Sequence, residues 1–152
     1  MRKQEREIRG DAEIREILQA APVCRIGLAD AGAPYVVPMN FGLGDGCLYL
    51  HCASEGRKLE ILRSNNRVCF EMDILREVRA GETPCGWTAD YRSVIGFGRA
   101  IFVADPQEKR VGLDSIMKHY RARGPFAYPE EILAKTVVIR IDIESISGKH
   151  HE

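Results

Sequence analysis

Segments in which apolar and polar residues alternate constrain the fold of this chain more than any other feature of its sequence. Three of them follow one another early in the chain, joined by short glycine-containing turns, at residues 24–29, 35–41 and 47–53. Alternation with period two places apolar side chains on one face of a β-strand, and short turns join antiparallel neighbours. We therefore expect a three-stranded antiparallel meander. Pro38 cannot donate a ladder hydrogen bond, so its strand should lie at an edge, at a bulge or beside something other than a strand.

The rest of the chain alternates between further strands and short helices. The predicted strands are 67–73, 91–104 and 136–147, and the predicted helices are 11–21, 54–65 and 105–124, with a brief helical turn at 129–131. Asp11 and Asp105 are the expected N-caps of the first and third helices. Gly96 and Gly98 inside the long strand favour bulges or bends of a curled sheet. These elements predict an α+β fold in which a predominantly antiparallel sheet closes into a barrel.

The length of 152 residues fits one domain. We expect a flexible N-terminal arm over residues 1–10, the folded domain over 11–148 and a short C-terminal tail over 149–152. Residues 74–88 contain glycine, proline and the single tryptophan, Trp87, and are predicted to form a long loop. Trp87 could cover a bound ring by stacking, or it could be a packing residue or a contact between subunits.

Charge and cysteine content exclude several classes of protein. Lysine and arginine total 22, as do aspartate and glutamate, so the formal net charge is zero. A neutral chain is a poor candidate for binding nucleic acid or an anionic membrane, and it is weakly protected against self-association. No apolar run approaches the ~20 residues that span a bilayer, and no secretory signal is recognised at the N-terminus. The five cysteines lack a CxxC pair, so we expect reduced thiols in a cytoplasmic protein and no metal site.

The stretch from His51 to Lys58 carries the strongest chemical signal. It lies between a predicted strand and a predicted helix, where unpaired amides and the helix dipole favour an anion such as phosphate. Ser54 can donate a hydroxyl, and Arg57 and Lys58 can donate charge-assisted hydrogen bonds. The alternative is an ordinary surface helix whose two cations are solvated.

Three sequence stretches in the same order resemble the pyridoxamine 5′-phosphate oxidase-like superfamily. They read PYVVPMNF from Pro34, LYLHCASEGRK from Leu48 and YRSVIGFG from Tyr91. The sequence is most similar to the flavin-nucleotide-binding, nitroimidazole-resistance (Nim) type, over about residues 12–148. The resemblance implies a split β-barrel homodimer with FMN in composite clefts at the subunit interface.

The resemblance also assigns roles to individual residues. The strand around Pro38 would lie along the isoalloxazine ring, the bend before the second helix would hold the phosphate, and the fifth strand would lie near the site or the subunit interface. The cofactor-binding residues implied in this way are Val37, Pro38, Met39, Asn40, Ser54, Arg57, Lys58, Tyr91, Ser93 and Val94. His51 matches a histidine that the Nim type places near the flavin, where an imidazole can exchange protons near neutral pH. A structural role for His51 is the alternative.

The function implied is that of an FMN-dependent oxidoreductase that passes electrons from NADH or NADPH to a small acceptor, including nitroaromatic acceptors. The alternative is a non-catalytic protein of the same superfamily that binds flavin, deazaflavin or haem. The chain lacks the C-terminal Arg-x-x-Pro-type segment that completes the substrate site of a true pyridoxamine phosphate oxidase. Pyridoxamine phosphate is therefore not the expected substrate.

Overall fold

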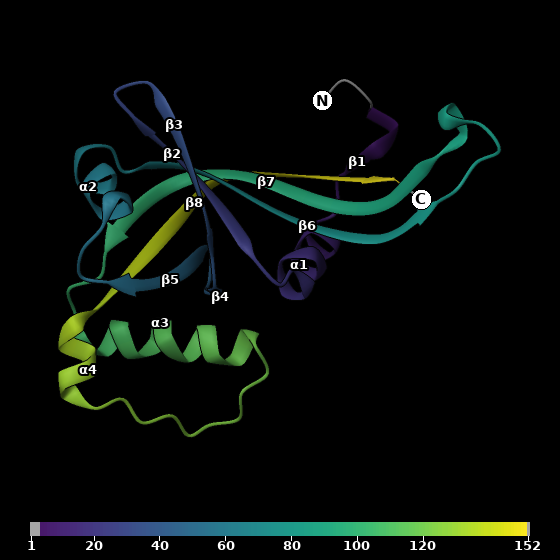
Figure 1. The fold of residues 1–152 in the computed structure, drawn as a ribbon. Helices are drawn as coiled ribbons and strands as arrows, with labels where there is room; N and C mark the ends of the chain where they lie inside the picture. Colours follow the sequence, from purple (N-terminus) through teal and green to yellow (C-terminus); the bar gives the residue numbers. More distant parts are fainter. Residues whose placement is uncertain (1–3, 152) are drawn as a thin grey trace.

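An eight-stranded antiparallel sheet forms the centre of the molecule in the computed structural model, which describes residues 4–151 (Figure 1). The strands follow the order β3-β2-β6-β7-β8-β5-β4, and the short β1 pairs with β8. Their bounds are β1 Glu7–Ile8, β2 Cys24–Asp30, β3 Ala33–Met39, β4 Phe41–Leu43, β5 Cys47–Ala53, β6 Arg67–Arg79, β7 Thr88–Phe102 and β8 Thr136–His151. The sheet curls around the main apolar cluster, a second and smaller cluster lies where α3 packs on β5, and the predicted split β-barrel is confirmed.

The barrel closes through a change of partner strand at Asn40. β3 pairs only with β2, whereas β4, which begins one residue after Asn40, pairs with β5 at the other end of the strand order. The predicted strand 35–41 is therefore two strands, and the simple meander is wrong because β3 and β5 are not neighbours. Pro38 lies on the edge strand β3, one of the positions that the sequence predicts for it.

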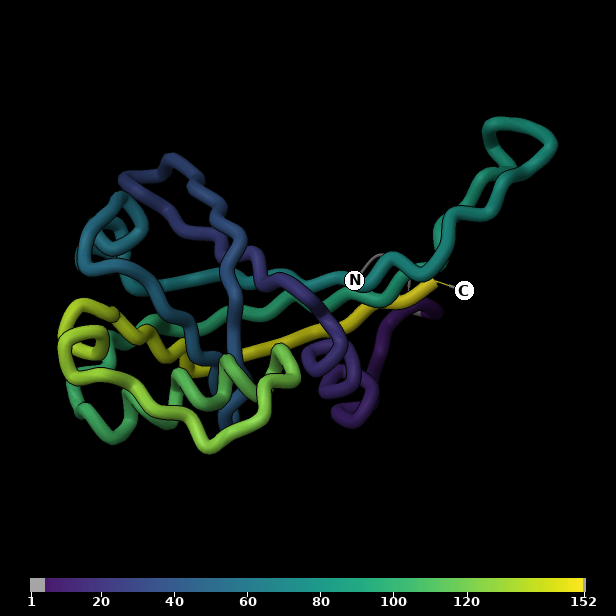
Figure 2. Tube along the Cα trace, turned by 60° about the horizontal axis from the view of Figure 1, so that its bottom comes forward, coloured from purple at the N-terminus to yellow at the C-terminus, as the bar shows by residue number. Residues whose placement is uncertain are grey.

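The paired strands β6 and β7 extend beyond the barrel as a long hairpin, which is the protruding segment in Figure 2. β6 continues to Arg79 and β7 already begins at Thr88, so residues 74–79 are strand and not the loop predicted from the sequence. The tip contains the 3₁₀ turn Pro84–Gly86 and the exposed Trp87. A register shift between Leu75 and Glu77 marks a bulge where the hairpin leaves the barrel.

Both ends of the described chain belong to the sheet. β1 pairs with Gly148 and Lys149 of β8, and Ile8 is buried in the core. The predicted flexible arm and C-terminal tail are thus corrected for residues 7–8 and 149–151, while residues 1–3 and 152 lie outside the described part. Gly148 does not end the strand. A Cβ on Gly148 would come within 2.8 Å of Ile8, so a glycine lets the two strands pack closely.

Four α-helices cover the barrel: α1 Asp11–Ala20, α2 Arg57–Ser64, α3 Pro106–His119 and α4 Glu130–Lys135. A 3₁₀ turn, Gln4–Arg6, precedes β1. α1 buries Ile14, Ile17 and Leu18, as their helical spacing predicts, although its N-cap is Gly10 and not Asp11. The predicted cap of α3 is confirmed, because the Asp105 carboxylate accepts a hydrogen bond of 2.7 Å from the backbone amide of Glu108.

The two glycines of β7 serve different purposes. A Cβ at Gly96 would lie 2.1 Å from the Phe70 ring, so the ring fills the space that a side chain at position 96 would need. Gly98 follows a register shift between β7 and β8, which confirms the predicted bulge at this position. No helix in residues 4–151 is both long and apolar enough to cross a membrane.

Candidate functional site

The bend between β5 and α2 places two cations beside the open end of a helix. Gly56 is the N-cap of α2 with φ of 127°, a backbone conformation that favours glycine, and a Cβ there would meet no atom within 4 Å. No side chain among the described residues caps α2. The backbone amides of Arg57 and Lys58, the first two of the helix, are therefore free to bind an anion, whereas the Leu59 amide already donates to the Gly56 carbonyl at 2.9 Å.

The edge strand β3 supports both cations. The guanidinium carbon of Arg57 lies 4.8 Å from the centre of the Tyr35 ring, which is a cation–π arrangement. The Nζ of Lys58 lies 3.2 Å from the Sδ of Met39. Tyr35 and Met39 point to the same side of the strand because they are separated by an even number of residues. β3 therefore places an aromatic face and a thioether against the two cations that the sequence predicts as phosphate ligands.

His51 lies next to this cationic pair. Its surface is largely exposed, but desolvation by the surrounding atoms lowers the pKa of the imidazole, and the positive charge of Lys58 lowers it further. The imidazole is consequently neutral at neutral pH and can both donate and accept a hydrogen bond. Burial raises the pKa of the neighbouring Cys52, so this thiol stays protonated.

The segment predicted to lie along a flavin ring presents its side chains in two directions. Val37 and Met39 are partly buried and pack against the core cluster, whereas Pro38 and Asn40 are exposed. Ser54 is exposed in the bend before α2. A ring lying along this strand would therefore contact Pro38 and Asn40 on the outer surface or the backbone at the strand edge.

The three predicted site residues on β7 are not part of the cluster around α2. The side chain of Val94 is 1% exposed and belongs to the core, so it is closed to any ligand. The Tyr91 ring stacks on His151 at 6.3 Å between centroids and has the Lys149 Nζ at 5.6 Å from its centre. Ser93 is paired in register with Asp73 and Lys149. Figure 1 shows α2 at one end of the barrel and the start of β7 toward the other.

A set of large apolar side chains is exposed on the outer surface of the sheet. Val36 and Phe97 stand in one register row across β3, β2, β6 and β7, and Pro38 and Ile95 stand in the next row on that face. We call these four residues the outer apolar face. Because Val36 and Pro38 alternate with Tyr35 and Met39 along β3, this face and the cationic cluster lie on opposite sides of one strand.

Sequence reasoning did not identify Tyr35 as part of the site. A signal was present, because an aromatic residue shares one face of the strand with Val37 and Met39. Which element packs against that face could not be read from the alternation alone. Within residues 4–151, no group of three His, Cys, Asp or Glu side chains is arranged to hold a metal ion.

These features define a class of protein: a small split β-barrel with a cationic strand-to-helix bend beside an edge strand. The family model described as pyridoxamine 5′-phosphate oxidase matches residues 10–150. The chain belongs to this family.

Two solved structures that are similar to the chain are named for nitroimidazole resistance and for FAD binding. A Bacteroides thetaiotaomicron protein named for 5-nitroimidazole antibiotic resistance is 34% identical, with a TM-score of 0.85 over 95% of this chain and 86% of that one. An FAD-binding protein of Mesorhizobium loti is 28% identical, with a TM-score of 0.71 over 97% and 98% of the two chains. The predicted resemblance to the Nim type is confirmed.

The fold alone is shared with a further solved structure. An FAD- and haem-binding protein of Mycobacterium smegmatis is 22% identical, with a TM-score of 0.87 over 97% of this chain and 74% of that one. A comparison with curated proteins returns no match.

Proposed function

We propose that the chain is an FMN-binding flavoprotein whose β5–α2 bend holds the phosphate of the nucleotide. The observation that carries this proposal is the uncapped N-terminus of α2 together with Arg57 and Lys58 in its first turn. Amide donors and two cations are complementary to a dianionic phosphate. The name of the similar Mesorhizobium loti structure supports a flavin, and the open space beside Gly56 leaves an anion access to the start of the helix.

The test is direct titration of FMN into the purified protein, followed by quenching of flavin fluorescence. Each charge-assisted hydrogen bond to phosphate contributes roughly 1.5–3 kcal/mol, so replacing both Arg57 and Lys58 by Ala should weaken binding by at least about 100-fold. Arg57 is exposed and Lys58 is only partly buried, so the variant should stay folded and unfold at a temperature only slightly below that of the wild type.

A matched control keeps this test specific. The double variant Arg63→Ala and Arg67→Ala removes the same charge from the end of α2 and the following strand, away from the helix start. It should bind FMN as the wild type does. Equal loss in both variants would mean that net charge and not the bend controls binding.

We further propose that the two copies of a homodimer share each flavin site. The outer apolar face lies on the opposite side of β3 from Arg57 and Lys58, so a second copy on this face would contact the same edge strand that supports the two cations. Pro38 and Asn40 would then lie between the two chains, against the ring. Tyr91 and Ser93 could reach a flavin in such a dimer from the partner chain.

The reaction we propose is transfer of electrons from NADH or NADPH to a small, including nitroaromatic, acceptor in the cytoplasm. Bound flavin would supply the redox chemistry. In this chain the bend orients the nucleotide, the edge strand positions it and the neutral imidazole of His51 provides a proton donor or acceptor at the site. Bleaching of the flavin absorbance by a reduced nicotinamide supports this role, whereas stable oxidised flavin or a haem Soret band favours a binding protein without this activity.

His51 is tested separately. His51→Ala should retain FMN, because the imidazole is not one of the phosphate donors, but should change the rate of acceptor reduction. An unchanged rate would assign His51 a packing role.

A further inference from the structure

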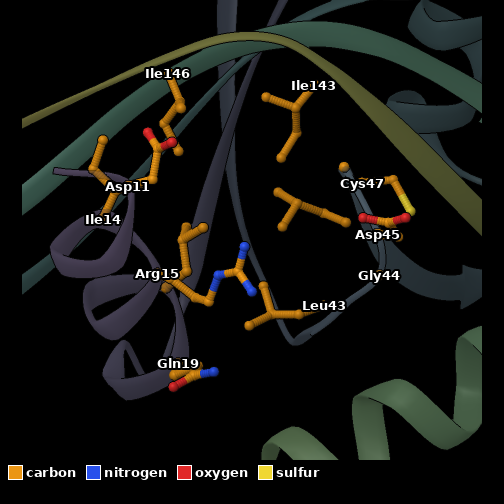
Figure 3. Close-up of a pocket in the computed structure, with 13 residues that line it drawn as sticks. Asp11, Ile14, Arg15, Gln19, Leu43, Gly44, Asp45, Cys47, Ile143 and Ile146 are labelled. Atoms are coloured by element: carbon orange, nitrogen blue, oxygen red, sulfur yellow. The ribbon is translucent and has the colours of Figure 1, made fainter.

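A cavity separate from the flavin cluster opens between α1, the β4–β5 turn and β8. Its volume is about 560 Å³, within the usual range of small-molecule sites. The apolar part of its wall comes from all three elements, through residues such as Ile14, Leu43 and Ile146 (Figure 3). The cavity includes none of the residues assigned above to the phosphate or the flavin ring.

Charged groups line the same cavity. Arg15 extends from α1 into the space, and Asp45 lies across from it in the β4–β5 turn, as Figure 3 shows. Asp11 stands one turn before Arg15 on α1. In the described part of the chain, none of these three side chains forms an ion pair or hydrogen bond with another residue. The cavity therefore presents an exposed guanidinium and exposed carboxylates, which water solvates, beside an apolar wall.

These charges discriminate between kinds of ligand. A purely apolar molecule would cover the wall but would displace water from the charged groups without replacing its hydrogen bonds. An apolar acid would pair with Arg15, but its negative charge would be repelled by Asp11 and Asp45. An apolar amine would pair with the carboxylates, but its positive charge would be repelled by Arg15. A zwitterion with an apolar side chain satisfies both signs at once.

From this complementarity we infer that the cavity binds a free α-amino acid with a large apolar side chain. The carboxylate of the ligand pairs with Arg15, its ammonium group pairs with Asp45 and its side chain packs against the apolar wall. The site is independent of the proposed flavin function, since the two share no residue.

The test uses three probes that differ by one charged group. L-Phenylalanine carries both groups, 3-phenylpropionate lacks the ammonium group and phenethylamine lacks the carboxylate. Calorimetric titration of each into the full-length protein should show L-phenylalanine binding at least about tenfold more tightly than either of the other two, since one charge-assisted contact is worth about that much. Equal binding of all three, or no binding of L-phenylalanine, would overturn the inference.

Variants then assign the two contacts. Arg15→Gln should lower the affinity for L-phenylalanine at least about tenfold while leaving that for phenethylamine unchanged. Asp45→Asn should lower the affinity for L-phenylalanine and spare 3-phenylpropionate. Arg123→Gln, in the loop after α3, removes a guanidinium outside the cavity and serves as the control. A pattern in which all three variants behave alike would contradict the assignment.

A third kind of variant separates folding from binding. Leu43 is only partly buried at the cavity wall, so Leu43→Trp can fill the space without adding charge. This variant should keep its FMN affinity and lose L-phenylalanine binding. Retained binding of L-phenylalanine would place the amino acid elsewhere and refute the site.

Discussion

Replacing Phe97 by Asp should separate the proposed dimer and empty its flavin sites. Phe97 is 52% exposed on the outer apolar face, which also contains Val36 at 61% and Ile95 at 45% exposure. Full burial of a phenylalanine side chain is worth about 1.5–3 kcal/mol, so covering the exposed half contributes about 1 kcal/mol. A symmetric interface contains the residue twice, which gives about 2 kcal/mol per dimer.

The expected effects follow from this value. Phe97→Ala should raise the dissociation constant of the dimer about 30-fold. Phe97→Asp should raise it by more than about 1,000-fold, because each buried carboxylate without a partner adds roughly 1–3 kcal/mol. The barrel itself should stay folded, because the side chain lies outside the core.

Light scattering over a dilution series measures the dimer, and bound flavin is measured on the same samples. Ile132→Asp is the matched control, since this residue is 56% exposed on α4 and lies off the outer apolar face. A Phe97→Asp protein that dimerises as the wild type does would refute the interface. A monomeric variant with unchanged FMN affinity would refute the shared site.

Further predictions concern single side chains. Tyr35→Leu should weaken FMN binding about two- to fivefold, because it removes a cation–π contact of about 0.5–1 kcal/mol from Arg57. Tyr35→Phe keeps an aromatic ring and should bind FMN as the wild type does. Equal effects of the two substitutions would contradict a positioning role for Tyr35. The His51 imidazole should titrate below its ordinary value of 6.5 by NMR, and Lys58→Ala should raise the pKa only part of the way back, because desolvation is the larger cause. Because the pKa of His51 is lower in the folded state, the folded state binds fewer protons than the unfolded state. The contribution of His51 should therefore lower the free energy of unfolding as the pH falls through 6.5. Gly96→Ala should lower the free energy of unfolding by about 1–3 kcal/mol or more, because its Cβ would overlap a core aromatic ring; an unchanged chemical-denaturation midpoint would contradict the packing described here.

Local chemistry was enough to predict much of the fold. The alternating segments, the edge position of Pro38, the cap at Asp105 and the bulge at Gly98 each depend on residues close together in the chain. Such features follow from backbone sterics and short-range hydrogen bonds, which depend only on residues that are neighbours in the sequence.

Features that depend on distant partners could not be predicted. Residues 35–41 alternate without interruption, so nothing local indicates that the chain exchanges β2 for β5 at Asn40. The hairpin beyond Asp73 was missed because Leu75 and Val78 are apolar but exposed, which breaks the usual link between alternation and burial.

The same distinction between local features and contacts with distant residues applies to the candidate site. Arg57 and Lys58 are adjacent in sequence to the helix start that they serve, so spacing alone predicted them. The support of Arg57 by Tyr35 depends on how β3 packs beside α2 and is seen only in the structure. Val94 was predicted from the resemblance, but its side chain faces the core.

Comparison of FMN with riboflavin isolates the contribution of the phosphate, because the two ligands differ only in that group. If the start of α2 holds that group, wild-type protein should bind FMN at least about 100-fold more tightly than riboflavin, and the advantage should shrink as salt is added. In the Arg57→Ala, Lys58→Ala protein the two ligands should bind nearly alike. Equal affinity of the wild type for both ligands would show that the start of α2 does not hold the phosphate.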